Sequence, residues 1–219
     1  MQIDPEDTSR SFAPEVFVIK EDVRRPLDLV CFSHLRWHFV TQRPQHLLTR
    51  CAQERRVFFW EEPYWDADDL TQGTPSLEVM QVQETLWVIR PHLSRQSDAD
   101  ATLRVLLRSF LAEQKIERFV RWYYTPMMLG FTSELEAEAT VYDCMDELSG
   151  FLGAPPELGE LEQKLFREAD VVFTGGMSLY EAKRKQHENV HAFPSSIDVA
   201  HFASAALSLI HISEPTRPY

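Results

Sequence analysis

Short apolar runs alternate with amphipathic segments from Leu27 to Asp198, and this alternation limits the possible folds more than any other feature of the chain. The run at 27–33 is a short apolar segment, which is typical of a strand buried in a parallel sheet. Further strands are predicted at 57–63, 119–124 and 139–145. Strands that alternate with amphipathic helices form βαβ units. The sequence therefore predicts an α/β class: a doubly wound, mostly parallel sheet with helices on both faces.

The segments between the apolar runs have the spacing of helices. Pro44 suits the first turn of a helix, where its missing N–H costs little, and residues 99–114 carry leucines in phase. Prolines open a further helix over 155–169, and the capping box Ser178 to Glu181 predicts the start of another. Shorter strands are predicted near 79–82, 86–89, 170–176 and 190–198.

The charge balance excludes one class of partner. A formal net charge of -12 argues against a nucleic-acid surface, which needs clustered Lys and Arg. The three cysteines form no close pair, so they predict neither a disulfide framework nor a zinc ribbon. No apolar run reaches the roughly 20 residues of a membrane span, and the polar start is no signal peptide. We expect a cytoplasmic protein.

The last residues differ in character from the rest. Residues 207–217, LSLIHISEPTR, are similar to the translation of a sequencing-library transposase adapter, codon by codon. We therefore leave 207–219 out of the functional argument and expect the natural protein to continue beyond about Ala206. The predicted organisation is an extension over 1–26, one Rossmann-like domain over 27–202, and a truncated junction with an adapter-derived tail over 203–219.

Ligands of such sheets bind in the loops after the carboxyl ends of the strands. The loop after the first strand holds Trp37, His38, Gln42 and Arg43, an aromatic ring with several donors, as sugar hydroxyls or phosphates require. A solvated loop explains the composition equally well. His34, His38 and His46 lack a carboxylate or cysteine to complete a metal site, so no metal is expected.

Acidic residues cluster where the strand over 139–145 ends. Asp143, Asp146 and Glu147 are placed to orient an acceptor hydroxyl or to stabilise a developing cation. The alternative is that Asp146 only caps the following segment. Three carboxylates in five positions at a strand mouth favour the functional interpretation.

Three further loops carry weaker signals. Gly175 and Gly176 precede a helix, where main-chain N–H groups can approach a phosphate, although tight turns want glycine in any case. The stretch 193–198 is polar and broken by proline, as in a linker or hinge. Glu61 follows the second strand, where an acid can hold a ribose hydroxyl; solvation at the surface explains Glu61 and Glu62 as well.

Four segments together resemble a known family: RWHFVTQRPQHLLTRCA, VYDCMDELSGF, EADVVFTGGMSLYEAKR and VHAFPSSIDVAHF. They are similar to the glycosyltransferase group-1 family, also called family 4, and most of all to its teichuronic-acid-biosynthesis members. The resemblance spans about residues 28–202. Family members usually read Pro-Asn-Gly-Val-Asp-x-x-x-Phe where this chain has Pro194, Ser195, Ser196, Ile197, Asp198 and Phe202.

The resemblance implies a GT-B architecture of two Rossmann-like domains, of which this chain holds the amino-terminal, acceptor-side one. It implies sugar transfer, with retention and without a metal or other cofactor, from a nucleotide-diphosphate sugar to a glycan or lipid-linked acceptor. A lipid-linked acceptor would bring the protein to the inner face of the plasma membrane by peripheral association. The fragment alone is expected to be inactive.

Site residues follow from the same resemblance. Asp143 and Asp146 are expected at the reaction centre, with Trp37, His38, Gln42 and Arg43 at the acceptor. The other expected substrate contacts are Glu147, Gly175, Gly176, Ser195, Ser196 and Asp198. Two other classes remain open: a non-catalytic sugar- or nucleotide-binding module on the same scaffold, and a nicotinamide-dependent oxidoreductase, which the absence of a GxGxxG fingerprint disfavours.

Overall fold

A computed structural model describes residues 26–65, 74–94 and 98–194. The predicted extension, the predicted junction and tail, and Ser195, Ser196 and Asp198 therefore lie outside the described residues, apart from Pro26. The strands are β1 Asp28–Ser33, β2 Val57–Glu61, β3 Tyr64–Trp65, β4 Ser76–Gln83, β5 Leu86–Leu93, β6 Phe119–Tyr123, β7 Ala139–Cys144, β8 Val171–Thr174 and β9 Val190–Ala192. The helices are α1 Arg43–Cys51, α2 Ala99–Glu113, α3 Leu129–Thr132, α4 Leu158–Glu168 and α5 Met177–Lys183, with short 3-10 turns at η1 Pro126–Met128 and η2 Leu148–Gly150.

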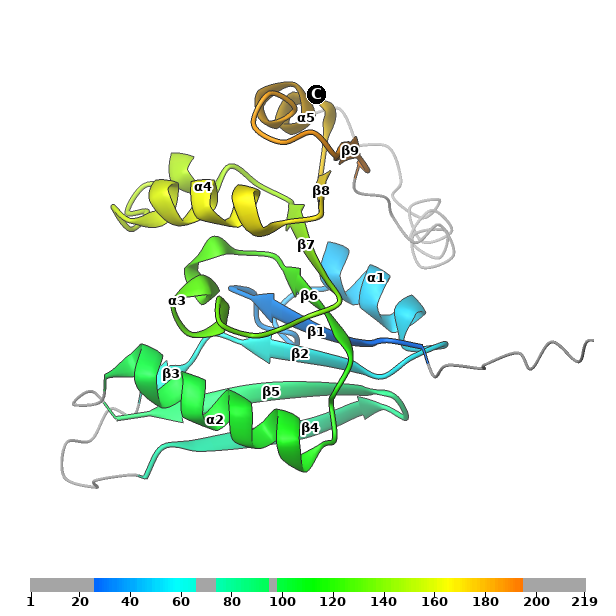
Figure 1. The fold of residues 1–219 in the computed structure, drawn as a ribbon, viewed down its shortest axis with the longest axis vertical. Helices are drawn as coiled ribbons and strands as arrows, with labels where there is room; N and C mark the ends of the chain where they lie inside the picture. Colours follow the sequence, from blue (N-terminus) through cyan, green and yellow to red (C-terminus); the bar gives the residue numbers. More distant parts are fainter. Residues whose placement is uncertain (1–25, 66–73, 95–97, 195–219) are drawn as a thin grey trace, which may run out of the picture.

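The strands form one sheet with β1 at its centre (Figure 1). The chain moves outward from β1 to β2 and β5 by parallel pairing, and then returns to pair β6 with the other side of β1. From β6 the order continues in parallel through β7, β8 and β9. The predicted doubly wound, mostly parallel sheet is confirmed. The order in which the chain adds strands to the sheet reverses between β1 and β6.

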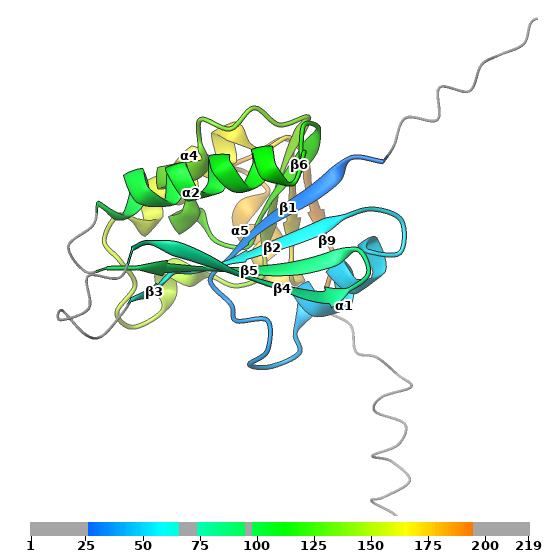
Figure 2. The ribbon, with the colours of Figure 1, turned by 90° about the horizontal axis from the view of Figure 1, so that it is seen from below.

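Helices cover both faces of the sheet. Figure 2 shows α2 and α4 on one side of the strands and α1 on the other. The α2 and α4 face holds the larger core, in which Phe32, Trp60, Phe110 and Tyr123 are buried. The α1 face holds a smaller core around Cys31, Leu48 and Phe59. All residues of β1 are buried because its side chains alternate between these two cores.

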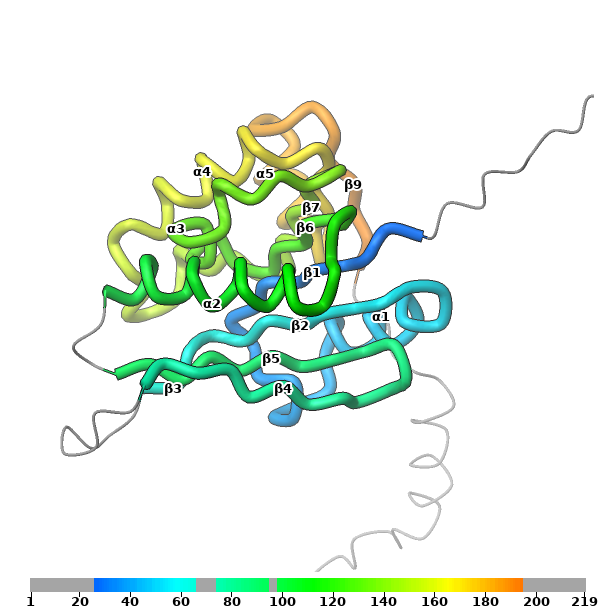
Figure 3. Tube along the Cα trace, turned by 60° about the horizontal axis from the view of Figure 1, so that its bottom comes forward, coloured from blue at the N-terminus to red at the C-terminus, as the bar shows by residue number. Residues whose placement is uncertain are grey.

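The crossover through α2 places β6 beside β1. The Cα trace in Figure 3 shows α2 running along the outer strands before the chain enters β6. Asp98 caps this helix by accepting a hydrogen bond from the Ala101 N–H at 3.1 Å. Leu103, Leu107 and Phe110 line its buried side, as their spacing predicts.

The structure differs from the sequence-based prediction at several elements. The strands β4 and β5 form an antiparallel hairpin at the edge of the sheet. The two-residue strand β3 and the turns of α3, η1 and η2 were not predicted, because segments this short carry no periodicity. The predicted capping box at Ser178 is wrong: Gly176 is the N-cap of α5, and Ser178 lies inside the helix.

Candidate functional site

The reversal between β1 and β6 defines the candidate site. The loop after β1 turns toward α1 on one face, and the loop after β6 turns toward η1 and α3 on the other. In open α/β sheets the loops diverge at such a point and leave a crevice at the carboxyl ends of the strands, where ligands bind. The residues of this edge come from the ends of β1, β2, β6, β7 and β8.

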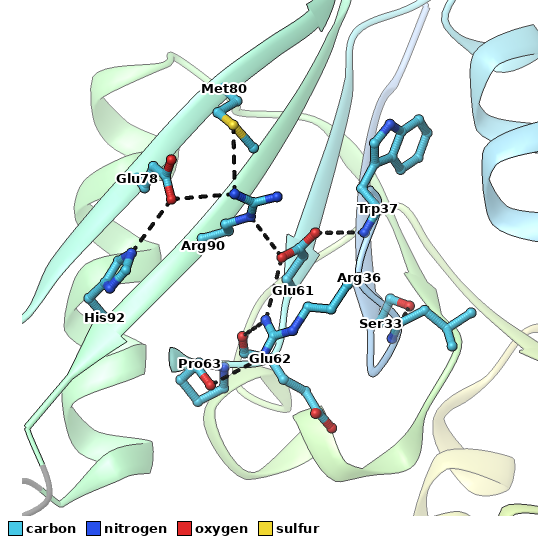
Figure 4. Close-up of polar contacts among 11 residues, drawn as sticks. Ser33, Arg36, Trp37, Glu61, Glu62, Pro63, Glu78, Met80, Arg90 and His92 are labelled. Atoms are coloured by element: carbon cyan, nitrogen blue, oxygen red, sulfur yellow. Dashed lines mark hydrogen bonds and ion pairs between the residues drawn. The ribbon is translucent and has the colours of Figure 1, made fainter. Parts of the chain in front are cut away.

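Glu61, at the end of β2, holds the loop after β1 (Figure 4). Its side chain is 0% exposed. One carboxylate oxygen accepts a hydrogen bond from the Trp37 main-chain N–H at 2.7 Å, and the other accepts one from Arg90 Nε at 3.0 Å. The interpretation of Glu61 as a surface-solvated residue is wrong, because β5 and the β1 loop cover it and supply its donors.

Arg36 completes this cluster from the loop itself. Its guanidinium lies 3.4 Å from the Glu61 carboxylate and also donates to the Glu62 and Pro63 carbonyls (Figure 4). The same group stacks on the Tyr64 ring, 3.9 Å from the centroid. Burial raises the pKa of Glu62, and the Arg36 charge opposes that shift. The Arg36 guanidinium therefore makes its hydrogen bonds and its stacking contact within the protein itself.

Gln45 gives the same loop a second anchor. Its side chain is buried; it donates to the Trp37 carbonyl at 2.8 Å and the Val40 carbonyl at 3.0 Å, and accepts from the Gln42 N–H at 2.9 Å. Sequence reasoning missed both Gln45 and Glu61 as anchors. The position of Gln45, three residues into the helix after Gln42, is the capping-box spacing that could have identified it.

Arg43 and Asp143 form an ion pair across the site. Both carboxylate oxygens lie 3.0 Å from Arg43 Nε, and the guanidinium also donates to the Phe193 carbonyl at the end of β9. The Asp143 side chain is 0% exposed. Burial raises the pKa of Asp143, and Arg43 opposes that shift. The structure thus joins α1, β7 and β9 through these two residues.

In the described part of this edge, three buried polar atoms lack regular hydrogen bonds, and two of them lie close to the ion pair. Trp122 Nε1, Tyr124 Oη and His34 Nδ1 are buried atoms that have no such partner among the described residues. The first two are nevertheless close enough to the Asp143 carboxylate to lower its pKa. Burial lowers the pKa of His34, against the opposing charge of Asp146. This part of the edge is polar, and Trp122 and Tyr124 are the groups that lie near the Asp143 carboxylate.

The loop after β7 is tied to α5 by a buried lysine. Lys183 Nζ lies 2.9 Å from a Glu147 oxygen and 2.8 Å from a Glu162 oxygen, and Tyr142 donates to Glu162 at 2.9 Å. Burial acts to raise the pKa of Glu147, but hydrogen bonds from Lys183 and Ser149 outweigh it and lower that pKa. Asp146 lies between the end of β7 and Glu147, and it is exposed.

Gly175 lies where two loops of the edge approach each other. Its N–H donates to the Cys144 carbonyl at 2.9 Å, and a Cβ added there would lie 2.7 Å from the Met145 oxygen. A glycine is required by this approach. A Cβ added at Gly176 would have no neighbouring atom within 4 Å.

The predicted site residues therefore fall into two groups. His38, Asp146 and Glu147 are exposed at the edge, and Gln42 is half-buried. Trp37 and Asp143 are buried; the Trp37 ring packs edge-on against Phe59, with 5.0 Å between centroids. Within the described ranges, no group of three or more His, Cys, Asp or Glu side chains is arranged to hold a metal ion.

Comparison with known proteins gives structural matches only. No protein-family model matches the sequence, and no curated protein is significantly similar to it. The structure resembles a trehalose-phosphate synthase from E. coli bound with UDP-2-fluoro glucose, with a TM-score of 0.55 and 12% identity over 84% of this chain and 53% of that one.

Two further solved structures also match the fold of this chain. A sucrose-phosphate synthase from Thermosynechococcus elongatus matches with a TM-score of 0.56 and 10% identity over 83% of this chain and 52% of that one. A trehalose-phosphate synthase from Burkholderia xenovorans, in complex with glucose-6-phosphate, matches with a TM-score of 0.53 and 12% identity over 85% and 54%.

The chain thus spans about half the length of these three structures. In the part of the chain that the structure describes, no helix is long and apolar enough to cross a membrane. The Rossmann-like sheet, its strand order and these matches agree, and the chain has the fold of one domain of a GT-B glycosyltransferase.

Proposed function

We propose that this chain is the acceptor-side domain of a glycosyltransferase that takes a sugar from a nucleotide-diphosphate donor. A second domain, which binds the donor, completes the active site, and transfer proceeds with retention and without a metal. The acceptor is a glycan or lipid-linked sugar of a cell-surface polysaccharide pathway, and the enzyme works at the inner face of the plasma membrane. The family 4 resemblance supports these finer assignments.

The observation that carries the proposal is the structural match to two-domain transferases over most of this chain but only about half of theirs. Fold alone does not fix function, because Rossmann-like sheets support many chemistries. The exposed polar residues at the carboxyl edge of the sheet are a second support for the proposal. Asp146 and His38 are exposed at the crevice where ligands of such sheets bind.

We assign the two aspartates different roles because their exposure and partners differ. Asp146 is exposed and is placed to accept a hydrogen bond from an acceptor hydroxyl. Asp143 is fully buried and paired with Arg43, so a substrate does not touch it. Asp143 is a positioning residue that fixes Arg43 and, through Arg43, the end of β9. Gly175 likewise shapes the edge by allowing two loops to meet.

Nucleotide release from UDP-glucose and GDP-mannose tests the proposal. The 219-residue chain is expected to release no nucleotide, whereas the protein completed with a donor-binding domain does so when acceptor is present. Turnover by the chain alone would contradict the division between two domains. In the completed protein, Asp146→Asn is expected to lower kcat about 100-fold, and Glu157→Gln, at an exposed position on the same loop, is the control.

One observation favours a second candidate, a non-catalytic sugar- or nucleotide-binding module. The carboxylate at the mouth of β7 is closed off by Arg43, which leaves fewer charged groups to react with a substrate. Under this alternative, the completed protein binds a nucleotide sugar in a titration but releases no nucleotide with any acceptor.

A further inference from the structure

Exposed apolar side chains gather at the carboxyl edge of the sheet. Ten large hydrophobic side chains are exposed among the described residues, and only Val79 and Val105 lie away from this edge. We call six of the others the apolar rim: Phe39 and Val40 after β1, Phe151 and Leu152 after β7, Met177 after β8, and Phe193 after β9. Phe39 is 82% exposed and Phe151 60%.

A concentration of this kind marks an interaction surface, since single exposed apolar residues are otherwise scattered over a protein. The rim residues come from loops on either side of the crevice between β1 and β6. The loop with Phe39 leads to α1 on one face, and the loop with Phe151 leads to α4 on the other. A ligand in the crevice would therefore lie between apolar loops.

Among the described residues of this edge, four cations are paired with carboxylates of the protein. Arg43 pairs with Asp143, Lys183 with Glu147 and Glu162, and both Arg36 and Arg90 with Glu61. A phosphorylated sugar would need free Arg or Lys donors to balance its charge. The described edge instead offers apolar side chains together with exposed Asp146 and Glu147.

We propose that this domain takes an uncharged acceptor whose sugar carries an apolar group, and that the apolar rim binds that group. This inference rests on the proposed function and names the acceptor class. The acceptor hydroxyl lies toward Asp146, and the hydrocarbon part lies against Phe39 and Val40. The assignment differs from the Burkholderia xenovorans match, a structure in complex with glucose-6-phosphate.

Three ligands with the same sugar test the proposal on the 219-residue chain. Octyl glucoside below its micelle concentration, methyl glucoside and glucose 6-phosphate are titrated separately and followed by ligand-observed NMR. Octyl glucoside is expected to bind at least about tenfold more tightly than methyl glucoside, because its chain buries apolar area. Glucose 6-phosphate is expected to bind no more tightly than methyl glucoside.

Two variants place the binding at the rim. Phe39→Ser with Val40→Ser is expected to weaken octyl glucoside about tenfold, and Leu152→Ser tests the other side of the crevice. Val105→Ser, at a position that is 65% exposed on α2, is the matched control and should leave binding unchanged. Each variant is compared with the native chain by circular dichroism.

Three results would overturn the proposal: tighter binding of glucose 6-phosphate than of octyl glucoside, equal binding by native and rim variants, or pelleting with neutral lipid vesicles without binding of the monomeric glucoside. The last would make the rim a membrane contact. Because this readout is binding, it is independent of sugar transfer. A failure of the proposed function appears separately, as absent nucleotide release by the completed protein.

Discussion

The loop after β1 and the loop after β7 lie at the same edge of the sheet but are held in different ways. Glu61, a buried acid, binds the main chain of the first loop at Trp37 and is surrounded by two arginines. The second loop is held by close main-chain packing at Gly175 and by the side-chain tie from Lys183 to Glu147. The first loop therefore depends mainly on buried charge, and the second on shape together with one partly exposed ion pair.

The largest effect is expected when the anchor of the first loop is removed. Glu61→Gln should lower the free energy of unfolding by about 3–5 kcal/mol, because it leaves Arg36 and Arg90 without their buried carboxylate. Urea denaturation measures the change. Glu78→Gln is the control, since Glu78 is half-exposed and pairs with Arg90 at 3.6 Å, and it should cost below about 1 kcal/mol. Equal losses in both variants would show that the first loop does not depend on buried charge.

The tie of the second loop should be weaker. Lys183→Met keeps the aliphatic stem but leaves Glu162 buried without its cation, and about 2–3 kcal/mol of unfolding free energy should be lost. Glu147 is 44% exposed and can turn toward water, which limits the loss. Lys164→Met, from a partly exposed pair with Glu168 on α4, should cost below about 0.5 kcal/mol. A loss as large as that of Glu61→Gln would remove the contrast between the loops.

The role of shape in holding the second loop is tested at Gly175 and Gly176, the two glycines after β8. Gly175→Ala should cost about 1–2 kcal/mol, because the new Cβ meets the Met145 oxygen at 2.7 Å. Gly176→Ala meets nothing within 4 Å and should leave stability within about 0.5 kcal/mol of the native value. Thermal unfolding of the pair measures the difference. Indistinguishable melting curves would mean that the loops separate without cost.

The smallest effect concerns pH. Burial lowers the pKa of His34 in the folded state, so the unfolded chain binds the proton first as pH falls. Stability from this group is present above the ordinary histidine pKa of about 6.5 and is lost as pH falls through the folded value, with a slope of at most about 1.4 kcal/mol per pH unit. His34→Gln should flatten that part of the profile. If His34→Gln keeps the native slope, the proton is taken up by another group.

The sequence predicted the sheet and its helices closely, but it predicted the site only in part. The alternation of apolar runs and helical spacings identified β1, β2, β6, β7, α2 and α4 to within a few residues. That the loops of this edge are the chemically active part of the chain stays a prediction. The burial of Asp143 and Trp37, and the anchoring roles of Glu61 and Gln45, were not predicted. These properties depend on which segments cover a side chain, and that information is not local.

By itself, the sequence determined the class of the fold, because strand and helix periodicity are properties of neighbouring residues. Only the tertiary structure decided which charges face one another. Arg43 and Asp143 are 100 positions apart. They meet because the sheet pairs β6 with β1 and β7 with β6, which brings the end of β7 close to the loop that leads from β1 to α1. Glu61 is buried because β5 and the β1 loop close over it. A charged residue has the same appearance in a sequence whether it ends in water or beneath another strand, and its environment is fixed only when the sheet is assembled.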